Sequence, residues 1–158
     1  MGLRASRRAR GFTILEFALV LPLFLLLLAA IIDFGIMFFV QHTLQFATRE
    51  GARLALVGRT VNDAGGNPMS REASIVQTIK VNAAVAVNPS KLQISFYPIN
   101  ADYSDPNGWQ GMQDAGGPGK YMRVKTRYTF PVPLVSTFVP QAQLVLTAQS
   151  TYRNERFN

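Results

Sequence analysis

The chain has 158 residues, enough for one membrane-length helix and one small domain. It contains no cysteine, which excludes disulfides, thiol nucleophiles and thiolate metal sites, and its single histidine, His42, argues against histidine-dependent triads. There are 16 Lys and Arg residues against 9 Asp and Glu residues, a net charge of +7. We expect no catalytic, cofactor-binding or metal-ligating residues, and therefore no enzyme.

Residues 1–11 form a basic leader. Arg4, Arg7, Arg8 and Arg10 lie here without an acidic residue, so much of the net charge belongs to this short segment. Basic residues beside an apolar segment tend to stay on the cytoplasmic side of a membrane. We therefore interpret the leader as an orientation signal and expect no nucleic-acid binding.

An apolar segment follows at residues 12–40, interrupted only by Glu16 and Asp33. It is long enough to cross a bilayer of about 30 Å at a rise of about 1.5 Å per residue. A cleaved secretory signal would have a core of only about 7–15 apolar residues followed by a small-residue cleavage site. The sequence after Ala29 and Ala30 does not fit such a site. We expect a transmembrane helix, with Asp33 solvated at its far interface.

Glu16 lies about one turn inside this segment, where a carboxylate costs about 2–3 kcal/mol or more unless it is paired, protonated or extended to the interface. A cut between Gly11 and Phe12 would place a new α-amino group on Phe12, one turn from Glu16 on the same face. Formed between neighbouring chains, this charge pair would fix their axial register. In the alternative interpretation, Glu16 extends to the lipid headgroups.

The helix is predicted to continue past the membrane, so that residues 12–58 form one segment about 70 Å long. Ala47, Gly51 and Ala55 recur at every fourth position and form a stripe of small residues. Such a stripe allows the close approach of another backbone. Either a neighbouring helix or the chain's own domain is expected to pack against it.

Residues 59–158 are predicted to form an extracytoplasmic α+β domain. After a loop at residues 59–69, Ser70 is expected to cap a second helix that extends to Val87, and Asn88 with Pro89 ends it. Alternating patterns predict three strands near residues 92–97, 122–130 and 144–152, forming an antiparallel sheet against that helix. The first of these strands is expected to be covered on one side.

The second strand carries a row of basic residues on one face: Arg123, Lys125 and Arg127. The row fits a solvated outer face of the sheet or a contact with an acidic partner.

A long loop at residues 98–119 concentrates acidic and turn-forming residues: Asp102, Asp105, Asn107, Gly108 and Asp114. They invite comparison with a calcium loop. Their spacing differs from that of an EF-hand, and no glutamate closes the loop. Asx turns account for them more simply.

The sequence resembles the TadE-like pseudopilins, minor pilins of the tight-adherence (Flp) branch of type IV pilus systems. The resemblance rests on Gly11-Phe12 after the basic leader, on Glu16-Phe17, and on three short runs. These are Ala-Leu-Val-Leu-Pro at residues 18–22, Asp-Phe-Gly at residues 33–35 and Ala-Thr-Arg-Glu-Gly-Ala-Arg at residues 47–53. Residues 123–155 are similar to the closing strands of the family more loosely.

The resemblance implies a non-enzymatic protein of the bacterial inner membrane with a cytoplasmic N-terminus and a periplasmic domain. A prepilin peptidase would cut between Gly11 and Phe12, and Glu16 would serve processing or assembly. The domain would act in initiation, priming or capping of a tight-adherence pilus, with other pilins and the inner-membrane assembly platform as partners. Phe17 stands where major Flp pilins usually carry tyrosine, which favours a minor component. The alternative is a single-pass membrane-anchored periplasmic binding protein that does not polymerise.

Overall fold

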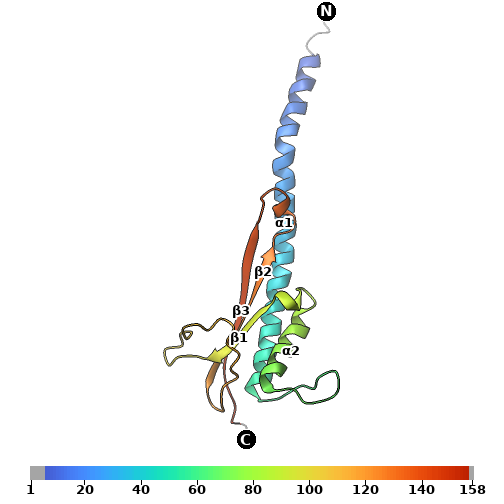
Figure 1. Ribbon diagram of the computed structural model, residues 1–158. Coiled ribbons are helices and arrows are strands. Elements are labelled where there is room, and N and C mark those ends of the chain that lie inside the picture. The colour runs from blue at the N-terminus through green and yellow to red at the C-terminus, as the bar shows by residue number, and fades with distance from the viewer. Residues whose placement is uncertain (1–5, 157–158) are drawn as a thin grey trace, which may run out of the picture. The chain divides into compact units, whose positions relative to one another are not determined.

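The computed structural model describes residues 6–156, with side chains described from Thr13 onward. The chain divides into two compact units, Met1–Met37 with Pro131–Gln143, and Phe38–Phe130 with Leu144–Asn158. The elements follow in the order α1, α2, η1, β1, β2, η2 and β3 (Figure 1). A long helix, a second helix and a three-stranded antiparallel sheet confirm the predicted α+β class.

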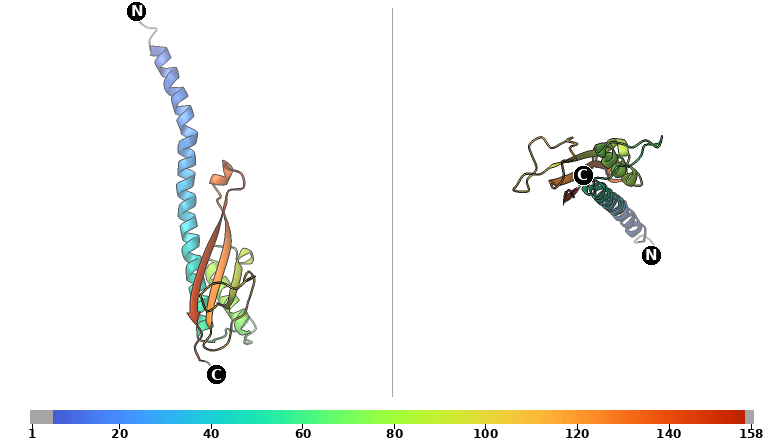
Figure 2. Two further views of the ribbon diagram at one scale, coloured as in Figure 1. Left: turned by 90° about the vertical axis from the view of Figure 1, so that its left-hand side faces the viewer. Right: turned by 90° about the horizontal axis from the view of Figure 1, so that it is seen from below.

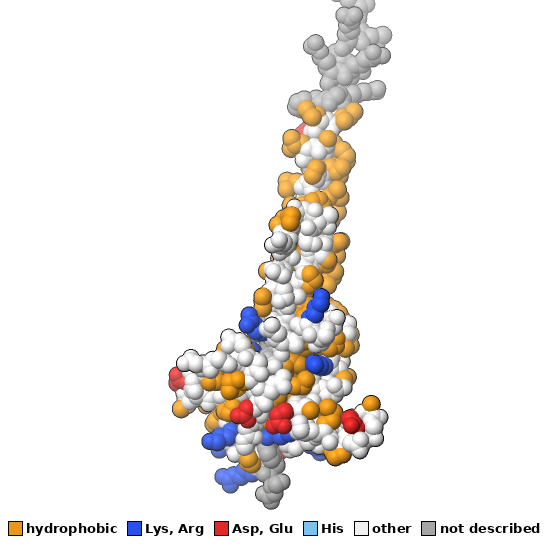
Figure 3. Space-filling view, viewed as in Figure 1, with side chains coloured by type: hydrophobic (Ala, Val, Ile, Leu, Met, Phe, Trp, Pro, Cys, Tyr) orange, Lys and Arg blue, Asp and Glu red, His pale blue; other side chains and the backbone are white. Residues whose placement is uncertain are grey.

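Helix α1, Ser6–Leu56, is continuous through Pro22. It begins within the predicted leader, because Arg and Ala favour the helix as strongly as the apolar residues that follow. Its first half exposes large apolar side chains on all sides, including Ile14, Leu19 and Leu23 at 70, 76 and 69 %. Figure 3 shows hydrophobic side chains along this part of the helix. Such a helix is long and apolar enough to cross a membrane.

Helix α2, Arg71–Ala83, begins as predicted, since the Ser70 side chain accepts a hydrogen bond from the Ala73 N–H at 3.1 Å. It ends at Ala83, so the predicted extension to Val87 was wrong. The Ala86 N–H donates to the Ala83 carbonyl at 3.0 Å, three residues back instead of four, so the chain leaves the α-helical pattern here. Val87 remains buried outside the helix.

The sheet consists of β1 (Gln93–Pro98), β2 (Tyr121–Pro131) and β3 (Gln143–Arg153) in that spatial order (Figure 2). Two short 3-10 helices flank these strands, η1 (Pro89–Lys91) and η2 (Val135–Thr137). Strand β1 pairs with β2 antiparallel, with Gln93 opposite Arg127 and Pro98 opposite Met122. The alternate residues Met122, Val124 and Thr126 of β2 are fully buried.

Strand β1 is covered on both faces, so the prediction of one-sided coverage was wrong. Ser95 and Tyr97 are buried together with Phe96. The loop after β1 folds back over the strand, and the Phe96 N–H donates to the Met112 carbonyl at 2.8 Å. The ring of Trp109 in the same loop lies 5.7 Å from that of Tyr97. The loop thus covers a free sheet edge that would otherwise invite pairing with another chain.

Candidate functional site: the carboxylates of the membrane-length helix

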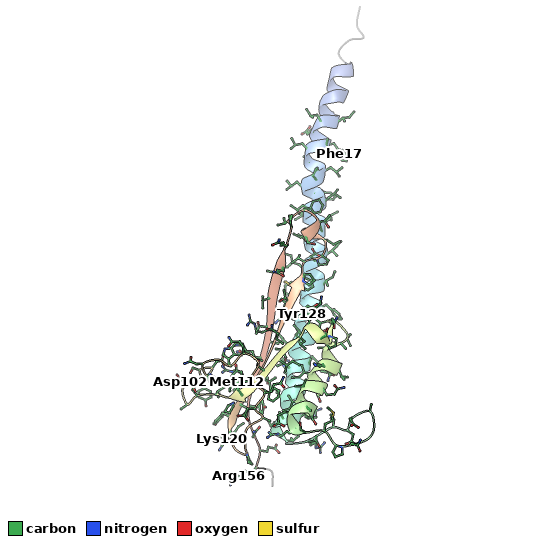
Figure 4. All side chains as sticks on the ribbon, in the orientation of Figure 1. Phe17, Asp102, Met112, Lys120, Tyr128 and Arg156 are labelled. Atoms are coloured by element: carbon green, nitrogen blue, oxygen red, sulfur yellow. The ribbon has the colours of Figure 1, made fainter. Side chains whose placement is uncertain are left out.

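Glu16 lies on the apolar part of α1, and its side chain is exposed. The adjacent Phe17, labelled in Figure 4, is 64 % exposed. The side chains of Gly11 and Phe12, the predicted processing site, lie outside the described residues. The charge pair between the Phe12 amino group and Glu16 therefore stays a prediction.

Asp33, the second carboxylate of α1, is only 2 % exposed. Its Oδ1 and Oδ2 accept hydrogen bonds from the Leu134 N–H at 3.1 and 3.0 Å, and Oδ2 accepts another from the Val135 N–H at 2.7 Å. The expectation that water solvates Asp33 was therefore wrong. Two backbone N–H groups replace water around the carboxyl oxygens.

The N-terminus of η2 needs this acceptor. Leu134 is the N-cap residue of η2 and makes no side-chain cap hydrogen bond. Proline at position 133 has no N–H, so the donors that need an acceptor are those of Leu134 and Val135. An N-cap Ser, Thr, Asp or Asn usually provides the acceptor for these N–H groups. Here Asp33 of α1 provides it instead. In the sequence, this contact is signalled only by the lack of a capping side chain at the start of the turn. That lack shows that an acceptor is needed, but it does not identify Asp33 as the acceptor.

The small-residue stripe of α1 lies inside the second unit. Ala47 and Ala55 are fully buried, and Gly51 is buried with them. A Cβ atom on Gly51 would lie 2.4 Å from Cγ1 of Ile79, a residue of α2. The chain's own second helix therefore occupies the position that the stripe leaves open at Gly51. A few residues away, the exposed His42 lies on the same helix.

The basic row on β2 meets its counterion inside the chain. Asp105 in the loop after β1 forms ion pairs with Arg123 and, at 2.9 Å, with Lys125. The Lys125 ammonium also lies 4.2 Å from the centre of the Trp109 ring. Arg123 and Lys125 are mostly buried and face Asp105 of the same chain, so the predicted solvated face was wrong for these two residues. A contact of the basic row with an acidic partner stays a prediction. Arg127 lines a cleft beside Trp109.

These contacts set the ionisation of the cluster. Burial opposes ionisation of Asp105, but hydrogen bonds from Lys125 and Arg123 outweigh it and lower the Asp105 pKa below its ordinary value. Burial and the adjacent Asp105 carboxylate raise the pKa of Tyr97. The Asp105 carboxylate thus remains charged at neutral pH and pins the loop to β2.

The remaining acids of the loop close turns. Asp102, labelled in Figure 4, accepts hydrogen bonds from the Ser104 N–H at 3.1 Å and hydroxyl at 2.7 Å. Asp114 accepts the Gly116 N–H at 2.8 Å. Asx turns thus account for both residues. In the part of the chain that the structure describes, no group of three or more His, Cys, Asp or Glu residues is placed to hold a metal ion.

Arg71 joins the end of α1 to the loop, a role that the sequence pattern did not reveal. Its Nη2 donates to the Ala55 carbonyl at 2.7 Å, and its Nη1 donates to the Gly116 carbonyl at 2.6 Å. Cationic side chains commonly satisfy the free carbonyls in the last turn of a helix. Here the fork of one guanidinium serves two segments at once.

A family model described as TadE-like protein matches residues 11–53. The match begins at Gly11, includes Glu16 and Asp33, and ends within α1. It confirms the resemblance seen in the sequence. The TadE-like family is a structural, pilus-associated family, and it suggests a Tad pilus-associated, minor-pilin-like protein with an N-terminal membrane helix. No curated protein and no solved structure matches the chain.

Proposed function

We propose that the protein is a minor pilin, inserted in the bacterial inner membrane by residues 12–40, that takes part in assembling, priming or capping a tight-adherence pilus. Its partners are a prepilin peptidase, other pilins and the inner-membrane assembly platform. The domain at residues 59–158 faces the periplasm. Once incorporated, the protein is also present with the pilus at the cell surface.

The observation that carries this proposal is the TadE-like match over residues 11–53. The matched segment contains both residues of the proposed cleavage site and the carboxylate proposed to pair with the new amino group. The exposed apolar surface of α1 supports the same function, because it needs lipid before assembly and neighbouring helices afterwards.

The proposed mechanism starts when the peptidase separates Gly11 from Phe12. The new ammonium group of Phe12 then lies about one helical turn from Glu16. An unpaired carboxylate is unfavourable in the low-dielectric interior of a helix bundle. The Glu16 side chain of one chain therefore forms an ion pair with the Phe12 ammonium group of a neighbouring chain. The pair forms only at one axial offset between the helices, which sets the register of the assembly.

A second candidate function is a membrane-anchored periplasmic binding protein that does not polymerise. A cleft of about 760 Å³ favours it, lined by Glu72, Tyr103, Asp114, Lys120 and Tyr121 among others. Its mixture of carboxylate, ammonium and phenol groups suits a small polar ligand.

The intact mass of the membrane-bound form, measured with and without the cognate peptidase, tests processing. We expect a mature N-terminus at Phe12 only when the peptidase is present. A chain that keeps Met1 under both conditions contradicts the processing step and favours the non-polymerising anchor.

The Glu16→Ala variant tests assembly. We expect normal membrane insertion but a loss of sheared surface pili, because insertion needs only the apolar segment. Glu50→Ala is the matched control, since it removes a carboxylate from the same helix beyond the apolar segment. Normal pilus output from Glu16→Ala rules out the proposed role of Glu16.

A further inference from the structure

We propose that the hairpin tip, Pro131–Gln143, inserts into the membrane beside α1 and forms a second lipid contact of this protein. The inference rests on the membrane placement of α1 in the proposed function. The tip and the first part of α1 belong to the same compact unit, so their contact is defined within that unit.

The tip has the composition of a lipid-facing segment. No charged residue occurs between Arg127 and Arg153. Large apolar side chains of the tip are exposed, with Leu134 at 38 %, Phe138 at 49 % and Val139 at 50 %. In water such a cluster is unfavourable, whereas a membrane removes these apolar side chains from water.

Asp33 places the tip at a defined depth. The Asp33 carboxylate holds the backbone of Leu134 and Val135. Asp33 itself lies within the apolar run, which continues through Phe34 and Ile36, both exposed, at 55 and 41 %. The tip is therefore held beside the apolar surface of α1. Lipid that surrounds this part of α1 also contacts the tip.

The backbone N–H groups at residues 131–140 of the tip suit a lipid environment. Inside a bilayer every polar backbone group must find a partner within the protein. Pro131, Pro133 and Pro140 have no N–H, and every N–H between Pro131 and Pro140 donates to an acceptor of the chain. The pairs are Val132 to Ala142, Leu134 and Val135 to Asp33, Ser136 to Val132, Thr137 to Leu134, and Phe138 and Val139 to Val135.

Side-chain chemistry adds to this internal pairing. The Ser136 hydroxyl donates to the Pro133 carbonyl at 2.9 Å. A surface loop in water does not need its N–H groups to pair within the chain, because water satisfies them. Paired N–H groups from Val132 to Val139, absence of charge and exposed apolar side chains occur together here, and lipid accommodates all three.

The absence of cysteine allows a direct test with single labelled thiols in the full chain. We would label Phe138→Cys in the tip with an environment-sensitive fluorophore and reconstitute the protein in phosphatidylethanolamine and phosphatidylglycerol vesicles. Leu25→Cys reports on the proposed span, and Gln149→Cys reports on an exposed position of β3. Lipids with a nitroxide at a shallow or a deep acyl position serve as quenchers.

We expect the shallow nitroxide to quench the label at Phe138→Cys, the deep nitroxide to quench the label at Leu25→Cys, and neither to quench the label at Gln149→Cys. The unlabelled thiol at position 138 should react with a water-soluble maleimide at least about tenfold more slowly than that at position 149, because a thiol in lipid stays protonated.

Quenching at position 25 without quenching at position 138 overturns the inference and leaves the membrane anchor intact. Absence of quenching at both positions contradicts the anchor itself. Protection of the label at position 138 that appears only as protein density in the vesicles rises, without lipid quenching, assigns the tip to a second copy of the chain and also overturns the inference.

Discussion

The Val135 N–H donates to Asp33 Oδ2 at 2.7 Å, across 102 positions of sequence. This bond and its companions from Leu134 satisfy the first free donors of η2, in the turn between β2 and β3. An acid that seemed to mark the edge of a membrane span instead fixes a distant turn on the helix.

Replacing Asp33 by Ala should release this turn. Two N–H groups lose their acceptor, and we expect hydrogen exchange at Leu134 and Val135 to accelerate by at least about tenfold, as for the loss of about 1.4 kcal/mol. Exchange measured on the full chain in detergent micelles checks this. Asp33→Asn keeps one oxygen acceptor and should show a smaller effect. Unchanged exchange in Asp33→Ala would contradict the capping role.

The Thr48 hydroxyl donates to the Leu44 carbonyl at 2.7 Å and lies 2.7 Å from the Thr126 hydroxyl. Because the single hydroxyl hydrogen of Thr48 is donated to the Leu44 carbonyl, the Thr126 hydroxyl must donate to the Thr48 oxygen. Both threonines are fully buried. Each single change to Val should lower the free energy of unfolding by about 1–2 kcal/mol, because it leaves a buried partner unsatisfied. The double variant should cost less than the sum of the two. Additive losses in denaturant titrations would show that the hydroxyls do not interact.

Gly51→Ala should destabilise the domain by about 1–3 kcal/mol, because the added Cβ overlaps a buried side chain. That side chain is Ile79, which is fully buried and cannot swing into solvent. Gly35→Ala on the same helix is the matched control, since its Cβ meets nothing within 4 Å. Thermal unfolding in micelles compares the two, and Ile79→Val should partly rescue Gly51→Ala. Equal melting temperatures for the two glycine variants would contradict the predicted packing.

Asp105→Asn should weaken the hold of the loop on β2. The side chains of Arg123 and Lys125 are 14 and 17 % exposed, and removal of their shared counterion should cost about 1–3 kcal/mol, between an exposed and a fully buried pair. Trp109 is the only tryptophan and lies beside Lys125, so its emission reports directly on this loop. An unfolding curve followed by this emission measures the loss.

The same carboxylate predicts a pH dependence. The pKa of Asp105 is lower in the folded protein than in the unfolded chain, so the pair stabilises the fold above the unfolded value of about 3.9. This contribution should disappear as pH falls from about 4 through the folded pKa. The acid slope of the unfolding free energy should therefore be smaller in Asp105→Asn. Identical slopes for the two proteins would show that Asp105 is not responsible.

Local signals determined much of the domain. Ser70 caps α2 as its side chain predicts, and the ranges of β2 and β3 match their alternation within about two residues. The end of α2 was missed because it depends on how the chain turns after Ala83, where no glycine or proline marks the exit. The second face of β1 was missed because a loop with many turn residues covers it, and the pattern of the strand does not contain that information.

The sequence by itself determined that residues 12–40 form an apolar helix, that Glu16 lies inside it, and that a TadE-like segment covers residues 11–53. These properties depend on residue type and short spacing. Only the tertiary structure decided where Asp33, Arg71 and Asp105 find their partners. A polar group can be satisfied by any donor or acceptor that the fold brings within about 3 Å, and sequence separation places no limit on which one that is.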